Sequence, residues 1–178
     1  MKKVKIHDKE FEIFIPYERI RSAVEKIADT MNMELAGKNP LFVCILNGSF
    51  MFAAELYKRI AIIDSEITFV KLASYQGDKT TGKVKQLIGL NEDIKGRTLV
   101  ILEDIVDTGI TIDNILTQLN GMEPAEIQIA TLLLKPDALI KDVQLDYVGL
   151  EIPNDFIVGY GLDYNQQGRN LIDIYKVV

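Results

Sequence analysis

Short, unbroken apolar runs followed by helical patterns constrain this fold more than any other feature. Leu41–Leu46 is continuously apolar, as in a strand covered on both faces, and a helix is expected from about Phe50 to Arg59 after a turn. Thr98–Leu102 is the strongest strand pattern, and a helix is expected from near Thr111. Alternating strands and helices predict an α/β fold with a doubly wound, mainly parallel sheet.

The rest of the chain fits the same plan. Val4–Ile6 and Phe11–Ile15 alternate around a polar break and predict a small hairpin, and a helix with one apolar face ends near Gly37. The Gly- and Thr-rich segment Ser74–Val84 predicts a mobile loop. Neither repeats nor linkers interrupt the sequence, so we expect a single domain over residues 1–178. Further strands are expected at Ile67–Leu72, Gln86–Leu90, Ile127–Leu134, Tyr147–Leu150 and Phe156–Val158.

Composition excludes several classes of site. Cys44 is the only cysteine and His7 the only histidine, which rules out an internal disulfide and disfavours a histidine triad or a histidine-metal cluster. The chain has neither an apolar run of the ~20 residues that span a bilayer nor a secretory signal, so a cytoplasmic protein without a membrane partner is expected. A net charge of −6 disfavours nucleic acid as a partner.

The segment Val100–Thr111 carries the clearest chemical pattern. Glu103 and Asp104 follow a strand, Asp107 comes next, and Thr108–Thr111 stands at the start of a helix. Main-chain N–H groups at such a start, two hydroxyls and the helix dipole suit one phosphate monoester. Paired carboxylates can accept hydrogen bonds from a ribose diol or organise a hydrated Mg²⁺. Acidic residues after strands and Thr or Asp at helix starts are each common alone, but the combination is far more specific.

This segment resembles the signature of type I phosphoribosyltransferases, a strand followed by E-D-x-x-D-T-G-x-T. The likeness to the hypoxanthine-guanine branch covers nearly the whole chain, and its last motif is specific to that branch. The resemblance implies the type I fold, with a small hood lobe from the N- and C-terminal segments. The other landmarks occur in the same order as in that branch: Leu46-Asn47-Gly48-Ser49-Phe50, Ser74-Tyr75, Lys135, and Asp155 to Asn165 with Arg169.

The resemblance also implies where phosphoribosyl diphosphate would bind. Glu103 and Asp104 would hold the ribose hydroxyls, and Ser74 and Tyr75 belong to a flexible loop over the site. Pyrophosphate would be bound by Arg169 and by the main chain of Leu46, Asn47 and Gly48, with a cis peptide before Asn47. The 5′-phosphate would be bound by Asp107, Thr108, Gly109, Ile110 and Thr111. Mg²⁺ would be the cofactor, held by Glu103, Asp104 and Asp163.

A purine site follows from the same resemblance. Lys135 would donate to the purine O6, Phe156 would stack on the base, and the Ile157 main chain would read its N1 edge, with Asp163 nearby. Asp107 would face N7 as the catalytic proton acceptor. The chain departs from the family pattern at Asn47, where a basic residue is common, and Ile110 adds no cation to the phosphate loop. Both departures increase the reliance on Mg²⁺.

The implied activity is purine salvage: transfer of phosphoribosyl to N9 of hypoxanthine, and of guanine, giving IMP or GMP and pyrophosphate. A homodimer or homotetramer is implied as well. Lys135 argues against adenine, because its donor would meet a 6-amino group. Three alternatives stay open: a phosphoribosyltransferase for xanthine or guanine, an RNA-binding regulator on the same fold, and a doubly wound domain without catalysis.

Overall fold

A six-stranded sheet forms the centre of the computed structural model, which describes residues 3–75 and 84–178. Neighbouring strands are parallel except for the antiparallel pair β4 and β5. The α/β fold with a mainly parallel sheet is therefore confirmed. In spatial order the strands are β5 (Val84–Ile88), β4 (Glu66–Tyr75), β3 (Leu41–Leu46), β6 (Thr98–Val106), β7 (Glu126–Leu134) and β8 (Tyr147–Glu151).

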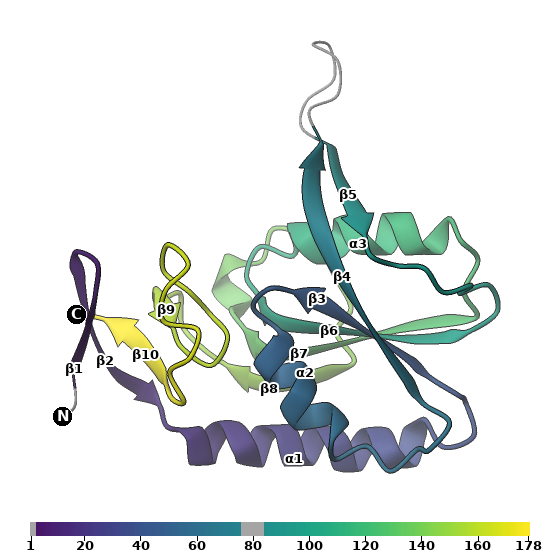
Figure 1. Ribbon diagram of the computed structural model, residues 1–178, viewed down its shortest axis with the longest axis horizontal. Helices are drawn as coiled ribbons and strands as arrows, with labels where there is room; N and C mark the ends of the chain where they lie inside the picture. Colours follow the sequence, from purple (N-terminus) through teal and green to yellow (C-terminus); the bar gives the residue numbers. More distant parts are fainter. Residues whose placement is uncertain (1–2, 76–83) are drawn as a thin grey trace.

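Helices cover both faces of this sheet (Figure 1). α1 (Tyr17–Glu34) and α2 (Phe50–Tyr57) pack on one face, and α3 (Ile110–Asn120) packs on the other. Successive strand residues point to opposite faces, so Cys44 lies under α1 and α2 whereas Val43 and Ile45 lie under α3. This double cover explains the unbroken apolar runs. Cys44 is a core residue, and burial raises the pKa of its thiol to about 11.

The order of the strands reverses between β3 and β6. From β3 the chain continues through α2 to β4 on one side, whereas β6, β7 and β8 lie on the other side. β6 pairs with β3 only as far as Leu102, but pairs with β7 as far as Val106. Ligands of open α/β sheets bind at the carboxyl ends of strands beside such a reversal.

A second, antiparallel sheet of four strands forms the hood, in the order β1 (Lys3–Ile6), β2 (Lys9–Ile15), β10 (Ile174–Val177) and β9 (Ile157–Val158). It lies beyond the carboxyl ends of the parallel strands, and both chain termini lie within it (Figure 1). The hood thus comes from the N- and C-terminal segments, as the resemblance implies. β10, which the sequence analysis did not identify, joins the two halves.

Several boundaries differ from expectation. β6 continues to Val106 instead of ending at Leu102, because its ladder with β7 runs on. β4 continues to Tyr75 because it pairs with β5 up to Val84, so the backbone of Ser74 and Tyr75 is strand and not loop. The rest of the expected mobile loop, residues 76–83, lies outside the described residues. Within the described part of the chain, no helix is long and apolar enough to cross a membrane.

Asp173 ties the hood to α1. The residue that precedes this helix, Pro16, has no side-chain cap, and Asp173 Oδ1 instead accepts a hydrogen bond from the Tyr17 N–H at 2.8 Å. We predict that Asp173→Ala lowers the free energy of unfolding by about 1 kcal/mol, the usual effect of losing a helix cap. Urea unfolding measures the change, with exposed Asp142→Ala as the control. An unfolding midpoint equal to that of the control would show that the cap contributes nothing.

Candidate active site

Two adjacent carboxylates at the end of β6 form the most unusual group in the structure. Glu103 is 7% exposed, and its Oε2 has no hydrogen-bond partner among the described residues. Burial, and then the neighbouring charge of Asp104, raise the pKa of Glu103 well above its ordinary value. Burial also raises the pKa of Asp104, although the Ile105 N–H donates to its Oδ1 at 2.8 Å. Acid oxygens left without protein donors suit ligand hydroxyls or a cation.

The loop after β3 packs directly against this acid pair. Its Leu46–Asn47 peptide is cis, as the resemblance implies. A Cβ atom on Gly48 would overlap Oδ2 of Asp104, so only glycine fits there. Ser49 is fully buried, and its hydroxyl bonds to the Ile45 carbonyl and lies 3.2 Å from Cys44 Sγ. The loop backbone is thereby fixed beside the carboxylates.

The turn from β6 into α3 has the expected form of an anion site. Gly109 precedes the helix at φ +79°, a conformation that glycine adopts without strain. The Ile110 N–H lies 3.4 Å from Thr108 Oγ1. A Cβ atom on Gly109 would approach Lys141 Cβ to 3.2 Å, so the connection after β7 closes over the turn. The first N–H groups of α3 therefore lie on the same edge of the sheet as the acid pair.

Lys141 supplies a cation here that the sequence analysis missed. Its N–H donates to the Thr108 carbonyl at 3.1 Å, and its ammonium lies 2.9 Å from Asp113 in the first turn of α3. Ile110 offers no charge within the turn, so the cation comes from a distant segment instead. No local pattern distinguishes Lys141 from an ordinary surface lysine, and only the fold places it there.

Lys135 and Asp107 meet where β6 and β7 end. The Lys135 N–H donates to the Val106 carbonyl at 3.0 Å, and the residue is only 8% exposed. Its ammonium lies 3.2 Å from Asp107 Oδ2 and 3.3 Å from Asn154 Oδ1. Asp107 is about half exposed and can reach a ligand. The structure thus brings the expected acceptor and the expected O6 donor together, and adds Asn154.

The hood contributes an aromatic ring and an open strand edge. Phe156 is 44% exposed, and its ring centroid lies 5.5 Å from that of Tyr164 and 6.2 Å from that of Phe11. The Phe156 carbonyl accepts from Val177 in β10 at 3.0 Å. Main-chain groups of an antiparallel strand alternate in direction, so those of Ile157 point away from β10, at the free edge of the hood sheet. A planar ligand on Phe156 could hydrogen-bond to them.

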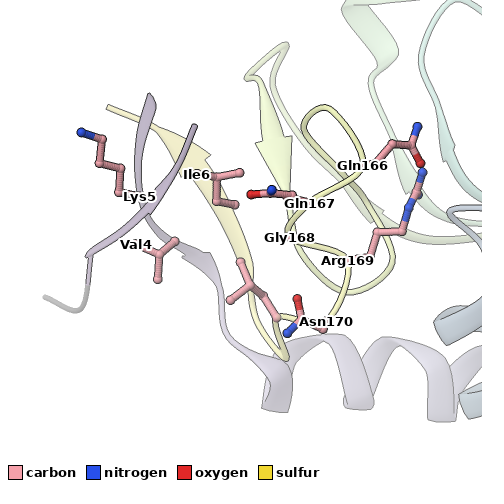
Figure 2. Close-up of a pocket in the computed structure, with 9 residues that line it drawn as sticks. Val4, Lys5, Ile6, Gln166, Gln167, Gly168, Arg169 and Asn170 are labelled. Carbon is pink, nitrogen blue, oxygen red and sulfur yellow. The ribbon is translucent and has the colours of Figure 1, made fainter. Parts of the chain in front are cut away.

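Arg169 and Asp163 form an ion pair on the loop after β9. Arg169 Nη2 lies 2.7 Å from Asp163 Oδ1, and its Nη1 donates to the Gly161 carbonyl at 2.7 Å. Gly161 in turn packs on the carbonyl of Gly48. A groove of about 560 Å³ lies between β1 and residues 166–171. In Figure 2 the Arg169 side chain is directed away from β1, toward the six-stranded sheet. Arg169 therefore lies on the side of the Gly48 loop.

The expected set of three metal ligands is not assembled. Among the described residues, no group of three or more His, Cys, Asp or Glu side chains could hold a metal ion. Asp163, which was expected to join Glu103 and Asp104, is instead paired with Arg169 and accepts from the Gln166 N–H at 2.7 Å. Glu103 Oε2 is the one buried carboxylate oxygen without a partner among the described residues, so a cation bound there needs further ligands from a substrate or water.

Comparisons with known proteins match nearly the whole chain. A model of the family described as "Phosphoribosyl transferase domain" matches residues 16–165. The chain is 39% identical over 161 residues to the hypoxanthine-guanine phosphoribosyltransferase of Streptococcus pneumoniae, covering 90% of this chain and 89% of the relative. It is 38% identical over 170 residues to the hypoxanthine phosphoribosyltransferase of Salmonella typhimurium, covering 94% and 95%. A crystal structure of a hypoxanthine phosphoribosyltransferase from Staphylococcus aureus is similar with a TM-score of 0.83 and 33% identity, covering 94% of this chain and 91% of that chain.

The buried acid pair should make stability fall as the pH rises. Folding raises the pKa of Glu103 above its ordinary value of 4.5, so the native state binds more protons than the unfolded chain between pH 4.5 and the raised value. The free energy of unfolding therefore decreases across that window. Glu103→Gln should flatten this slope and raise the free energy of unfolding near neutral pH by roughly 1–3 kcal/mol, the cost of a buried group without partners.

Urea unfolding from about pH 5 to about pH 8 tests this expectation. Glu151→Gln, on the exposed end of β8, is the matched control. A slope that Glu103→Gln leaves unchanged would mean that other groups govern the pH dependence.

Proposed function

The chain belongs to the phosphoribosyl transferase family, and from that membership we propose that it transfers phosphoribosyl from phosphoribosyl diphosphate to N9 of hypoxanthine or guanine. The named relatives supply the bases, and the reaction is one of purine salvage. One observation carries the proposal. An acid pair, a phosphate-type helix start and the Lys135–Asp107 pair lie at one edge of the six-stranded sheet, and Phe156 lies in the hood, so a sugar phosphate and a base fit side by side.

The sugar phosphate would lie along β6 and its turn. Glu103 Oε2 has no partner among the described residues, and the carboxylates of Glu103 and Asp104 would accept hydrogen bonds from the ribose 2′- and 3′-hydroxyls. The N–H groups from Thr108 to Thr111 would bind the 5′-phosphate, helped by the α3 dipole. Lys141 stands beside this turn and would offset part of the phosphate charge.

Pyrophosphate would lie between the Gly48 loop and Arg169. Because Gly48 has no side chain, its main chain can approach the ligand closely. Arg169 is held near this loop, since its Nη1 donates to the Gly161 carbonyl and Gly161 packs on the carbonyl of Gly48. Mg²⁺ fits this place because carboxylate oxygens are the hard ligands that it prefers, and Glu103 Oε2 has no partner among the described residues. When bound, the ion would neutralise charge on the departing pyrophosphate.

The base would lie between the hood and the end of β7. Phe156 offers a half-exposed ring for stacking, and Ile157 offers main-chain groups to the N1 edge. Lys135 would donate to O6, which favours 6-oxopurines over 6-aminopurines, since an amino group offers the ammonium no acceptor. The residues named do not separate hypoxanthine from guanine or xanthine.

The chemistry follows from these positions. The bond from C1′ to the pyrophosphate oxygen breaks, positive charge develops on the ribose ring, and N9 forms the new bond to C1′. Asp107 would accept the N7 proton as the purine ring becomes more acidic. The Lys135 ammonium, 3.2 Å from Asp107, keeps that carboxylate directed at the base side. A cytoplasmic location and a homodimer or homotetramer stay predictions.

A spectrophotometric assay tests the proposal directly. Purified protein is given phosphoribosyl diphosphate, Mg²⁺ and, in separate reactions, hypoxanthine, guanine, xanthine or adenine. Turnover of hypoxanthine or guanine with release of pyrophosphate is expected, and adenine should be the poorest substrate. Failure of all four bases, combined with RNA retention in filter binding that weakens with salt, would favour the regulator instead.

Substitutions of the three carboxylates in β6 and its turn should change different kinetic constants. Asp107→Asn should lower kcat by ~10²–10⁴, the range for one positioned acid-base group, with the affinity for phosphoribosyl diphosphate largely kept. Glu103→Gln and Asp104→Asn should act mainly on KM for phosphoribosyl diphosphate, because ribose hydroxyls change little in charge during the reaction. Steady-state kinetics and direct binding measure both effects. Near-parental kcat for Asp107→Asn would refute this division of labour.

Asp163 should influence the metal requirement through its pairing with Arg169. Asp163→Asn removes the charge that holds Arg169, so the guanidinium beside the pyrophosphate loses its fixed position. We predict a higher Mg²⁺ concentration for half-maximal rate. Titration of the rate with Mg²⁺ checks this, with Asp142→Asn as the control. An identical metal dependence in both variants would assign Asp163 a purely structural role.

A further inference from the structure

Asn154 lies on the short connection between β8 and β9, next to the O6 donor. Its Oδ1 is 3.3 Å from the Lys135 ammonium, and its side chain is exposed on the side of the base site. Asn154 belongs to no motif in the sequence, since it lies between Pro153 and the motif that begins at Asp155. Its contact with Lys135 bridges two segments that are 19 residues apart.

The ammonium of Lys135 has a limited set of partners. A lysine ammonium has three N–H donors and accepts nothing. Asp107 Oδ2 takes one donor and Asn154 Oδ1 takes a second. One donor remains for a ligand. Because the Lys135 side chain is only 9% exposed, little water surrounds the ammonium, and these two oxygens on either side set where the third donor points.

A neutral amide is well suited to this task. A single carboxylate, Asp107, compensates the charge of Lys135, whereas Asn154 orients the ammonium without adding a second negative charge. If the Asn154 side chain were removed, Asp107 would be left of the two side chains that now accept from the Lys135 ammonium. The ammonium would then turn toward Asp107. The donor for O6 would then be misdirected, although the lysine itself would be intact.

We propose that Asn154 is the positioning residue for base recognition, and that it acts by holding the Lys135 ammonium between Asp107 and the purine O6. The inference rests on the proposed function and deepens it, since it names a determinant of 6-oxopurine affinity. Asn154 need not touch the base. Asn154 affects the affinity for the base only by positioning Lys135. A substitution of Asn154 should therefore change KM for the base only when Lys135 is present.

Kinetics of a double-mutant cycle test the inference. Asn154→Ala should raise KM for hypoxanthine about tenfold, the loss of one hydrogen bond to a charged group, while KM for phosphoribosyl diphosphate stays at the parental value. Asn154→Asp retains an acceptor oxygen but adds a second negative charge beside Lys135, so KM should recover only in part relative to Asn154→Ala. The double variant Lys135→Ala/Asn154→Ala should be no worse than Lys135→Ala alone, because Asn154 has nothing left to position. Asn120→Ala, exposed at the far end of α3, is the matched control.

The outcomes separate cleanly. A parental KM for hypoxanthine in Asn154→Ala, or strictly additive effects in the double variant, would overturn the inference while leaving the proposed function intact. A parent protein inactive with both hypoxanthine and guanine would overturn the proposed function and the inference together. Thermal unfolding of each variant, with a midpoint close to that of the control, shows that any change in KM reflects positioning and not loss of structure.

Discussion

The pairing between β3 and β6, and the point where it stops, is the constraint on which the rest of the site depends. The two strands run side by side as far as Leu102, and then β3 turns into its cis-peptide loop while β6 continues along β7. Glu103 and Asp104 lie in the part of β6 that runs beside β7 but no longer pairs with β3. Asp104 Oδ2 therefore faces Gly48 of the loop, whereas the Glu103 carboxylate is buried with its Oε2 unpartnered among the described residues.

The acid pair illustrates how a site can oppose stability. Elsewhere in the described structure, carboxylates such as Glu55 and Glu126 have cationic partners, and their pKa values are lowered. Glu103 and Asp104 instead have raised pKa values and few donors, and Gly48 must lack a side chain to fit beside them. A substrate with two hydroxyls, or a cation, would remove a penalty that the free protein carries, which adds to its binding free energy.

The elements that the sequence predicted are those with strong local patterns. α1, β3 and β6 were evident because their apolar residues are continuous or spaced for one helix face, and the chemical segment from Glu103 to Thr111 is contiguous. β10 was missed because it is short and its partner β2 lies about 160 residues away. Lys141 and Asn154 were missed for a related reason: each acts through a contact between distant segments, to which no local spacing points.

The hood has a consequence for the order in which the protein can mature. β2 is synthesised about 160 residues before its partner β10. The six-stranded sheet lies between them in the sequence and can form on the nascent chain, but the hood sheet cannot close until β10 has been made. Until then β2 has an unpaired edge next to β1. A nascent chain without β10 would therefore hold the proposed sugar-phosphate site but lack the proposed place for the purine.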